Sequence, residues 1–456
     1  MNRPQSTIQI ERLLAYLASG IHSAAEIAGR LGCSQPTVSR LVAGAGDRIV
    51  VAGRARARRY ARVRSVGGLG GEFPVYSIDS RGDAHVLGTL IAAAQEHFVW
   101  HPVEGRDVVF RGLPWFLADL YPDGFVWRAF AHRIHTEFGL PARAQDWSAD
   151  HVLTALARRG EDLMGNLVVG RESLERYFRM TRETPAPVAE DGLGEEYCRL
   201  AEKALSGGPA GSSAGGEQPK FTAVIARDGG AVNVLVKFSP FVDTAEGRRW
   251  ADLLLCEEIA LHTIREHGSV PASISRVVEA GGRTFLEVQR FDRVGLHGRL
   301  PIVSLRAVDA EFYGHQDSWC AAADRMTADG RLSQEDASAM RWLSAFSGLI
   351  GNNDRHFGNI SLVMADDREV FRLAPAYDVL PMVYRPADGT MQSRPLVPPA
   401  VDPGCAAEWD STVACAVRFW ERAADDARIS PAFRSLCREN LQVTRRLCEG
   451  PRLQVW

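Results

Sequence analysis

The segment that most restricts how this chain can fold is a polar loop at residues 351–359, Gly-Asn-Asn-Asp-Arg-His-Phe-Gly-Asn, set between apolar stretches. Asn359 follows Asp354 by five positions, and a second aspartate, Asp378, follows nineteen positions later. The residues between them contain two apolar runs that predict short strands. A strand pair of this length would bring Asn359 and Asp378 back to face one another. Carboxylate and amide oxygens are hard ligands that suit Mg²⁺.

An aspartate, an asparagine and a second aspartate at these spacings are typical of ATP-dependent phosphoryl transfer. In that chemistry the first aspartate accepts or orients the proton of the attacking hydroxyl, so Asp354 is the candidate catalytic residue. Asn359 and Asp378 are the candidate ligands of Mg²⁺, which is held against the phosphates of ATP. Asn, Asp and Gly are also the commonest turn residues, so the polarity of the loop alone fits a plain surface turn as well.

Composition restricts the class of protein. A chain of 456 residues, 46% of them hydrophobic, has room for roughly two to four domains. The 53 Lys and Arg residues nearly balance the 56 Asp and Glu residues, so net charge alone indicates no nucleic-acid or membrane partner. The 8 cysteines form no Cys-x-x-Cys pair and no His–Cys cluster, which argues against structural zinc and a disulfide framework. We therefore expect reduced thiols, and the absence of signal and membrane-spanning patterns predicts a cytoplasmic protein without a membrane partner.

Residues 1–64 concentrate positive charge, with 11 arginines against 3 acidic residues. Apolar residues at helical spacing predict helices over residues 8–17, 23–31 and 34–42, with Ser23 and Ser34 as N-caps. The alternating segment 48–60, with a glycine near its middle, predicts a hairpin. Helix, turn, helix and hairpin is the pattern of a winged helix-turn-helix domain, which binds DNA.

In such a domain the third helix enters the major groove, and the wing lies along the phosphate backbone. We therefore predict DNA as a partner of residues 1–64. The candidate contacts are Gln35, Thr37, Ser39 and Arg40 from the third helix, and Arg54, Arg56, Arg58 and Arg59 from the hairpin. The same fold also serves as a protein-docking module, and this alternative stays open.

The next segment, residues 72–195, is predicted to form a subdomain of its own, reached through the glycine run 67–71, which reads as a hinge. Strands are expected over residues 75–78, 85–91 and 98–100. The Trp and Phe residues that follow are interpreted as core, because large aromatic side chains carry most of the buried area of a small lobe.

Residues 196–295 are predicted to form a nucleotide-binding lobe. The segment 206–220 is rich in glycine and leads into an apolar strand. Glycines such as Gly215 and Gly216 leave backbone N–H groups free to approach phosphate oxygens. A flexible linker has the same composition, so the glycines alone do not establish a phosphate site.

The strand predicted over residues 233–238 is a second indication of a nucleotide site. Lys237 is the one charged residue in the run 233–238, and a lysine is expensive to bury unless an anion meets it. The phosphates of ATP would do so. The alternative is an edge strand whose lysine points into water.

A helix predicted over about residues 246–267 carries Glu257 and Glu258, either of which could pair with Lys237. The strand 283–289 leads into a hinge, where backbone groups of Gln289 and Phe291 are candidates for hydrogen bonds to an adenine. Residues 296–456 are then predicted to form a mainly helical lobe that carries the polar loop.

Five motifs follow one another along the chain: Gly-Gly-Glu-Gln-Pro-Lys (215–220), Val-Lys-Phe (236–238), Gln-Arg-Phe-Asp-Arg (289–293), Asn-Asp-Arg-His-Phe-Gly-Asn (353–359) and Leu-Ala-Pro-Ala-Tyr-Asp-Val-Leu (373–380). In this order they resemble the HipA-like family of toxin Ser/Thr kinases. The likeness covers about residues 75–450. The added N-terminal helix-turn-helix resembles the YjjJ-type branch of that family.

The resemblance implies an α+β fold with a bilobal, PI-kinase-like body that uses ATP and Mg²⁺ to phosphorylate Ser or Thr of a protein. By position it implies Asp354 as the catalytic aspartate, Asn359 and Asp378 as metal ligands, and Lys237 as the lysine that contacts phosphate. Lys220 and His356, which lie inside the motifs, join the candidate nucleotide-binding residues. Ser213 takes the place of the family's inhibitory autophosphorylation serine.

The resemblance also suggests a translation-linked substrate, such as an aminoacyl-tRNA synthetase. Two features depart from the family pattern: the hinge has Gln289 where Glu is common, and the DNA-binding head is fused to the chain instead of residing in a separate antitoxin. Dependence on an antitoxin therefore stays open. So do two other interpretations, a transcriptional regulator whose kinase-like body senses nucleotide and a metal-dependent enzyme that acts on DNA.

Overall fold

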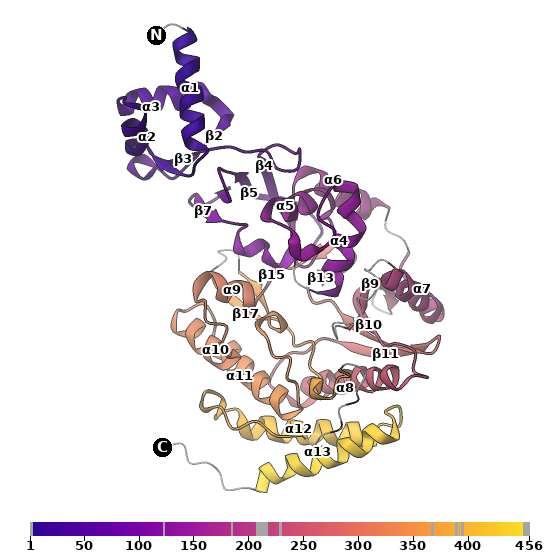
Figure 1. The fold of residues 1–456 in the computed structure, drawn as a ribbon. Helices are drawn as coiled ribbons and strands as arrows, with labels where there is room; N and C mark the ends of the chain where they lie inside the picture. The colour runs from indigo at the N-terminus through magenta and orange to yellow at the C-terminus, as the bar shows by residue number, and fades with distance from the viewer. Residues whose placement is uncertain are drawn as a thin grey trace. The chain divides into compact units, whose positions relative to one another are not determined.

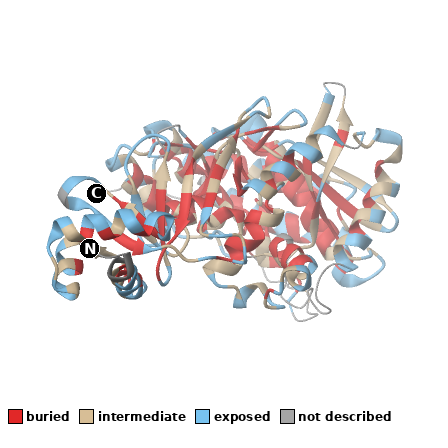
Figure 2. Cartoon of the chain, turned by 90° about the horizontal axis from the view of Figure 1, so that it is seen from above, coloured by how far each residue is buried: buried red, intermediate tan, exposed pale blue. Residues whose placement is uncertain are grey.

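The structure is a computed structural model that describes residues 3–121, 124–183, 186–206, 218–227, 230–365, 369–387, 391, 393 and 396–449. The chain divides into two compact units, residues 1–122 with 134–184, and residues 123–133 with 185–456 (Figure 1). In both units, buried residues follow the strands of the sheets and the packed sides of the helices (Figure 2). Within the described residues, no helix combines the length and apolar character needed to cross a membrane.

The first unit begins with helices α1 (Arg3–Leu17), α2 (Ala24–Leu31) and α3 (Gln35–Ala45), and with a small sheet in the order β1-β3-β2 (His22–Ser23, Arg59–Arg62, Ile49–Ala52). Ser23 caps α2, because its hydroxyl accepts the Glu26 N–H while the Glu26 carboxylate accepts the Ser23 N–H at 2.6 Å. Gly32 ends this helix at φ 63, a left-handed conformation that suits glycine. The helices lie where the sequence predicts them, and α3 runs three residues further than expected.

The rest of the first unit is built on an antiparallel sheet in the order β7-β6-β5-β4-β8, which comprises Val108–Arg111, His97–Pro102, Ala84–Ala92, Glu72–Ile78 and Leu167–Val169. Helices α5 (Ala149–Arg159) and α6 (Arg171–Arg182) pack beside it, and α4 spans Phe125–Phe138. Strands β4, β5 and β6 match the prediction. The sequence analysis missed β7, an edge strand whose residues are half-buried or exposed and so lack the alternation that marks a core strand.

The predicted hinge at residues 67–71 is instead a closed turn. The Val66 N–H donates to the Gly70 carbonyl at 2.9 Å, and the Ala92 N–H donates to the Gly71 carbonyl at 2.8 Å. The glycines serve here to adopt positive φ, as at Gly67 with φ 57, and not to provide flexibility. Val50, Ala52 and Ala61 of the N-terminal part also share a core with Ile91, Ala93 and Val99 of the larger sheet. The two parts of the first unit are therefore packed against each other.

The second unit contains an antiparallel sheet in the order β11-β12-β10-β9, which comprises Ser275–Ala280, Arg283–Gln289, Gly230–Phe238 and Lys220–Arg227. Helix α7 (Leu193–Ser206) contributes Tyr197 to the aromatic core on this sheet, and α8 (Ala245–His267) packs Leu254 against β12. Strand β10 lies between two neighbours, so Lys237 sits in an interior strand. The edge-strand alternative for this lysine is wrong.

The remainder of the second unit is mainly helical, with α9 (Leu305–Phe312), α10 (Trp319–Ala328), α11 (Gln334–Leu349), α12 (Trp409–Asp425) and α13 (Pro431–Glu449). Helices α12 and α13 lie side by side (Figure 1). Short strands form the pair β13-β14 (Arg293–Val294, Gly298–Arg299) and the sheet β15-β16-β17 (Ile302–Ser304, Ser361–Met364, Phe371–Leu373). Strands β16 and β17 are the pair predicted between Asn359 and Asp378. The fold is a mixed α/β fold.

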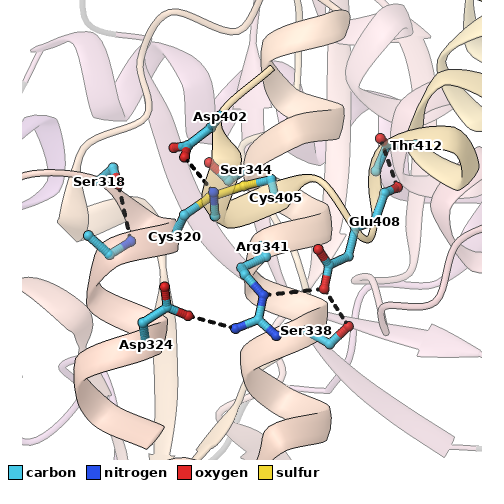
Figure 3. The surroundings of a disulfide bond; sticks show 12 residues. Ser318, Cys320, Asp324, Ser338, Arg341, Ser344, Asp402, Cys405, Glu408 and Thr412 are labelled. Carbon is cyan, nitrogen blue, oxygen red and sulfur yellow. Dashed lines mark hydrogen bonds and ion pairs between the residues drawn. A yellow bond between two sulfur atoms is a disulfide. The ribbon is translucent and has the colours of Figure 1, made fainter. Parts of the chain in front are cut away.

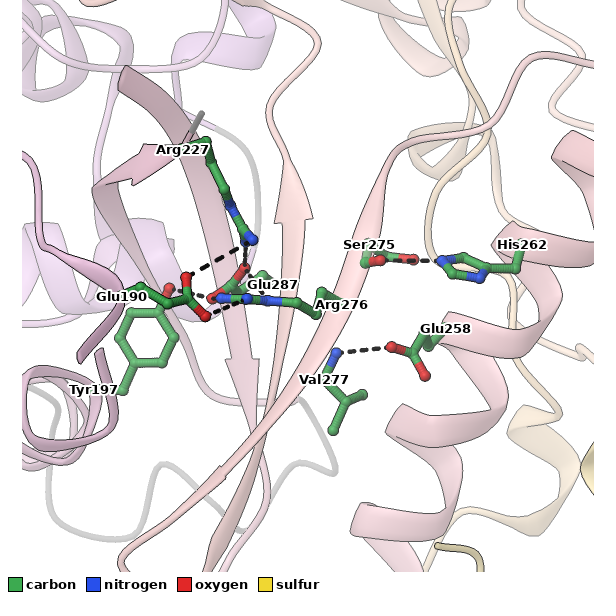
Figure 4. A network of polar contacts seen from close by, with 9 residues as sticks. All are labelled: Glu190, Tyr197, Arg227, Glu258, His262, Ser275, Arg276, Val277 and Glu287. Atoms are coloured by element: carbon green, nitrogen blue, oxygen red, sulfur yellow. Dashed lines mark hydrogen bonds and ion pairs between the residues drawn. The ribbon is translucent and has the colours of Figure 1, made fainter. Parts of the chain in front are cut away.

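A buried carboxylate ties α7 to the sheet of the second unit (Figure 4). Glu287 on β12 accepts hydrogen bonds from the Tyr197 hydroxyl at 2.8 Å and from Arg276 at 2.9 Å, and it also pairs with Arg227. Its side chain is 2% exposed, so the charge is tolerable only because these donors surround it. Burial, reinforced by the Glu287 charge, raises the pKa of Tyr197 well above its ordinary value. The network fixes four elements to one another on the side of the sheet away from α8.

The expectation of reduced thiols is contradicted at one place, where Cys320 in the first turn of α10 is bonded to Cys405 (Figure 3). The two residues are 85 positions apart and are buried at the contact between α10 and the turn Pro403–Cys405. Spacing in the sequence could not reveal this pair, because only the tertiary fold brings the two cysteines together. Free thiols are present at Cys33, Cys198, Cys256, Cys415 and Cys437.

Candidate active site

The centre of the site is a buried lysine with two carboxylate partners. Lys237, from β10, is 3% exposed, and its Nζ lies 2.6 Å and 2.7 Å from the two carboxylate oxygens of Glu257 on α8. The same Nζ donates to Asp378, which follows β17. The backbone N–H of Asp378 donates to Glu257 at 3.2 Å, so the three residues form a closed set of contacts. Asp378 reaches this position at φ 54, a left-handed conformation that Asp adopts more readily than most residues.

The charges of this trio are interdependent. Burial by itself would lower the pKa of Lys237, but Asp378 and Glu257 outweigh it and raise the pKa, so the lysine stays protonated. Burial raises the pKa of Glu257 in spite of Lys237. The pKa of Asp378 is lowered, because Lys237 and then Lys220 outweigh the opposing effect of burial. Two carboxylates thus contact the single ammonium of Lys237, and the charge of Lys220 also acts on both of them.

The structure settles which glutamate of α8 pairs with Lys237. Glu257 is fully buried against the lysine. Glu258 instead accepts the backbone N–H of Val277 at 2.9 Å (Figure 4) and also pairs with Arg428 at 2.7 Å. Neighbouring residues of a helix point about 100° apart, so both cannot face the same strand atom. Glu257 is therefore the partner.

The polar loop is joined to this trio through Asn352, a residue that the sequence analysis did not single out. Asn352 is 2% exposed, its side-chain oxygen accepts the Asp354 N–H at 3.0 Å, and its side-chain nitrogen donates to the Asp378 carbonyl at 3.2 Å. One amide thus links the backbones of both aspartates. Its place inside a run of polar loop residues gave no signal, because the link exists only once β16 and β17 have brought Asp378 back.

The side chains of the loop point in different directions. Asn359 donates its amide N–H to the Asp354 carbonyl at 2.7 Å, which fixes its orientation and leaves its oxygen as the acceptor. The Asp354 side chain is 44% exposed, so it is accessible to a substrate. His356 is also exposed, with its Nε2 4.0 Å from the Asp354 carboxylate.

The other residues predicted to bind the nucleotide differ in whether the structure brings them to the site of Lys237. Lys220 starts β9 opposite Lys237, and its charge acts on Asp378 and Glu257, so it belongs to the same electrostatic site. The Gln289 N–H already donates to the Ile274 carbonyl at 2.8 Å, so it is not free to bind an adenine. The ring of Phe291 lies 5.6 Å from that of Tyr377, next to Asp378. Ser213, Gly215 and Gly216 lie outside the described residues.

The candidate DNA contacts of the first unit are mostly exposed. Gln35, Ser39 and Arg40 lie on the outer side of α3, and Arg40 donates to the half-buried Thr37 at 3.2 Å. Arg54, Arg58 and Arg59 are exposed around the turn between β2 and β3, and Arg59 lies 3.7 Å from Glu26. The side chain of Arg56 lies outside the described residues.

A fold of this kind is found among known proteins. Residues 69–178 match the YjjJ-like toxin middle domain, and residues 212–443 match the HipA-like C-terminal domain. Among solved structures, HipA of Shewanella oneidensis MR-1, determined with HipB and operator DNA, shares the fold at a TM-score of 0.52. That match is 14% identical and covers 82% of this chain and 97% of that chain.

A curated relative gives the closer assignment. Toxin YjjJ of Escherichia coli (strain K12) is 36% identical over 442 residues, which span 96% of this chain and 98% of the relative. The chain therefore belongs to the HipA-like toxin family, in its YjjJ-type branch.

The buried pair makes a testable prediction about stability. In Lys237→Met, Glu257 loses its counter-charge, so its folded-state pKa should rise further above the unfolded value. A carboxyl of this kind holds its proton in the folded state, so stability is retained below the unfolded pKa of about 4.3 and falls as pH rises above it. We expect Lys237→Met to lose about 3–5 kcal/mol at pH 8 and clearly less at pH 5, from urea midpoints.

The double variant Lys237→Met/Glu257→Leu serves as the control, because it removes the fully buried one of the two carboxylates that lose Lys237. Its loss of stability between pH 5 and pH 8 should be smaller than that of the single variant. Parallel pH profiles for the single variant and the parent chain would show that Glu257 does not depend on Lys237 for its charge.

Proposed function

We propose that this chain is an ATP- and Mg²⁺-dependent protein Ser/Thr kinase of the HipA toxin type, with a bilobal, PI-kinase-like body and a DNA-binding head. The observation that carries the proposal is the buried Lys237, held by Glu257 and Asp378 and linked through Asn352 to Asp354. An isolated structural ion pair would not need a second, partly exposed carboxylate. An ammonium beside an accessible carboxylate suits a ligand that brings both phosphates and a metal.

The residues at the site fit a magnesium ion. Asp378 is 25% exposed, and the orientation of Asn359 leaves its side-chain oxygen available, so both offer the hard oxygen donors that Mg²⁺ takes. When bound, Mg²⁺ neutralises phosphate charge and orients the γ-phosphate. Lys237 and Lys220 would bind the phosphates through their positive charges. Backbone N–H groups of the glycine segment that carries Gly215 and Gly216 would donate hydrogen bonds to the phosphates.

In the proposed reaction, the oxygen of a Ser or Thr hydroxyl forms a bond to the γ-phosphorus of ATP. The bond from that phosphorus to the bridging oxygen breaks, and ADP leaves with the electron pair. Asp354 orients the hydroxyl and accepts its proton, which it later releases to water. Asn352 holds Asp354 in register with Asp378, and His356 is proposed to assist nucleotide binding. Ser213 is the proposed site of autophosphorylation.

The proposed substrate class is supported by the family assignment alone. The relative from Escherichia coli is named a toxin, and we propose that this chain acts likewise, on a translation-linked protein such as an aminoacyl-tRNA synthetase. The related Shewanella oneidensis HipA was determined with HipB. A fused head makes a separate antitoxin of that kind dispensable for DNA binding, so we do not assign one here.

The kinase proposal predicts that Asp354→Asn and Asp378→Asn lower phosphate transfer from labelled ATP to the chain itself and to lysate proteins. The loss should be about 100-fold or more, because each change removes a group that acts on the reacting atoms. Removal of Mg²⁺ with EDTA should have the same effect. Glu335→Gln, an exposed carboxylate in the first turn of α11, is the matched control and should leave transfer unchanged.

Two outcomes would replace this proposal. Binding of ATP without any transfer, to the chain or to lysate proteins, would identify a nucleotide-sensing regulator. Metal-dependent nicking of DNA that needs no ATP and is lost in Asp378→Asn would identify an enzyme that acts on DNA.

We also propose that the N-terminal part of the first unit binds duplex DNA as a winged helix-turn-helix. The support is the concentration of arginines in residues 1–64, with Arg40, Arg54 and Arg58 exposed on α3 and around the following turn. An exposed cationic surface of this kind neutralises phosphates and releases counterions, so the binding should be salt-dependent.

Arg54→Ala and Arg58→Ala should each reduce the slope of log affinity against log salt by about 1, equally for all DNA sequences. Gln35→Ala should instead relax sequence preference. Arg81→Ala, whose side chain is 78% exposed in the turn between β4 and β5, is the matched control. If the slope of log affinity against log salt is unchanged in the Arg54 and Arg58 variants, the proposal that the N-terminal part binds DNA is wrong. Deletion of residues 1–64 is the poorer test, because it would expose the shared core at Ile91 and Val99.

A further inference from the structure

A cavity of about 520 Å³ opens beside Asp354, within the second unit. Its walls come from the catalytic loop at residues 353–356, from the start of α10, and from the segment that contains Asp402, Cys405 and Trp409. Figure 3 shows Asp402 and the disulfide of this last wall. The volume lies in the range of specific ligand sites. Lys237 and Asp378 do not line it, so the cavity is separate from the residues proposed to hold the phosphates and the metal.

The cavity has acidic character, because Asp317, Asp354 and Asp402 line it and, within the described part of the chain, only Asp317 is paired with an arginine. Asp317 also lines it but receives the Arg325 guanidinium at 2.7 Å and 2.9 Å, which keeps its pKa at about 2. Asp402 is exposed, its side chain accepts the Gly404 N–H at 2.9 Å, and among the described residues it forms no ion pair. Its negative charge therefore faces the cavity.

The cation of the lining does not compensate Asp402. Arg355 is exposed, but one of its guanidinium nitrogens is engaged, because it donates to the Ser344 carbonyl of α11 at 3.1 Å. Desolvation lowers the pKa of Arg355 although the charge of Asp402 acts in the opposite direction, and among the described residues the two side chains form no ion pair. Asp402 thus remains available to an incoming cation.

The other walls suit the stem of a long side chain. Trp319 is buried, and Trp409 and Pro399 are half-buried, so the cavity offers apolar surface next to the Asp402 carboxylate. Lysine and arginine combine an apolar stem with a cationic head, which matches this combination. The carboxylates of Asp354 and Asp402 would repel the phosphates of a nucleic acid.

We propose that this cavity is the acceptor site, and that it takes an extended protein segment with a Lys or Arg close to the Ser or Thr that is phosphorylated. The hydroxyl is presented to Asp354, and the basic side chain lies along Trp409 with its head at Asp402. The transfer step rests on the proposed kinase function, whereas binding of the segment does not.

Binding of fluorescent peptides to the full-length chain tests this directly, by anisotropy with Mg²⁺ and a nonhydrolysable ATP analogue present. The peptides carry a central serine in an alanine background, with Arg or Glu placed at each flanking position in turn. Arg at one or two positions should tighten the Kd about fivefold over Ala, and Glu there should weaken it, which corresponds to one partly exposed ion pair. Asp402→Lys should reverse the preference, and Asp402→Asn should abolish it.

Glu335→Lys is the matched control, since it reverses an exposed carboxylate in the first turn of α11 that does not line the cavity, and it should keep the preference for Arg. Equal Kd values for Arg and Glu peptides, or a preference that survives in Asp402→Lys, would overturn the proposal. Phosphorylation of the same peptides separates the two ideas. Transfer without a basic preference refutes the acceptor site alone, whereas an Asp402-dependent preference without any transfer refutes the kinase and leaves the peptide site.

Discussion

The contact of Lys237 with Glu257 and Asp378 is the interaction on which the rest of the second unit depends. A lysine in an interior strand cannot remain charged among apolar neighbours unless anions meet it. To supply them, α8 must present Glu257 to β10, and the chain must return to the same point at Asp378, which is 141 positions from Lys237. The charge requirement therefore fixes the sheet, the long helix and the segment after β17 relative to one another.

The two carboxylate partners of Lys237 differ in their exposure to solvent. Glu257 is fully buried and holds the lysine, whereas Asp378 is partly exposed and can exchange Lys237 for another cation. Asn352 carries this arrangement into the polar loop, because it bonds to the backbones of Asp354 and Asp378. Asp354 in turn lines the cavity at Asp402. The position of one buried amide thus links the proposed metal site to the proposed acceptor site.

Patterns of local origin could be predicted from the sequence. The helices of the N-terminal part, the strand that carries Lys237 and the strand pair after Asn359 all follow from periodicity and turn residues. The cap of α2 at Ser23 could also be predicted, because capping depends only on residues close in the sequence. These features need no knowledge of distant parts of the chain.

What could not be predicted depends on tertiary contacts. The choice of Glu257 over Glu258 follows from the rotation of α8 against the sheet, and the engaged N–H of Gln289 follows from its pairing with the segment at Ile274. The bond between Cys320 and Cys405 joins positions whose spacing carries no meaning by itself. The glycine run 67–71 has the composition of a hinge, but the backbone hydrogen bonds of its neighbours close it into a turn.

The most direct test of the central claim is to locate a metal ion in crystals of the full chain grown with Mn²⁺ and a nonhydrolysable ATP analogue. Manganese substitutes for magnesium at oxygen sites and is identified by its anomalous scattering. The proposed chemistry predicts a peak about 2.0–2.3 Å from the Asp378 carboxylate and the Asn359 side-chain oxygen, with Lys237 within hydrogen-bond distance of a phosphate oxygen. A peak elsewhere, or an analogue bound away from these residues, would contradict it.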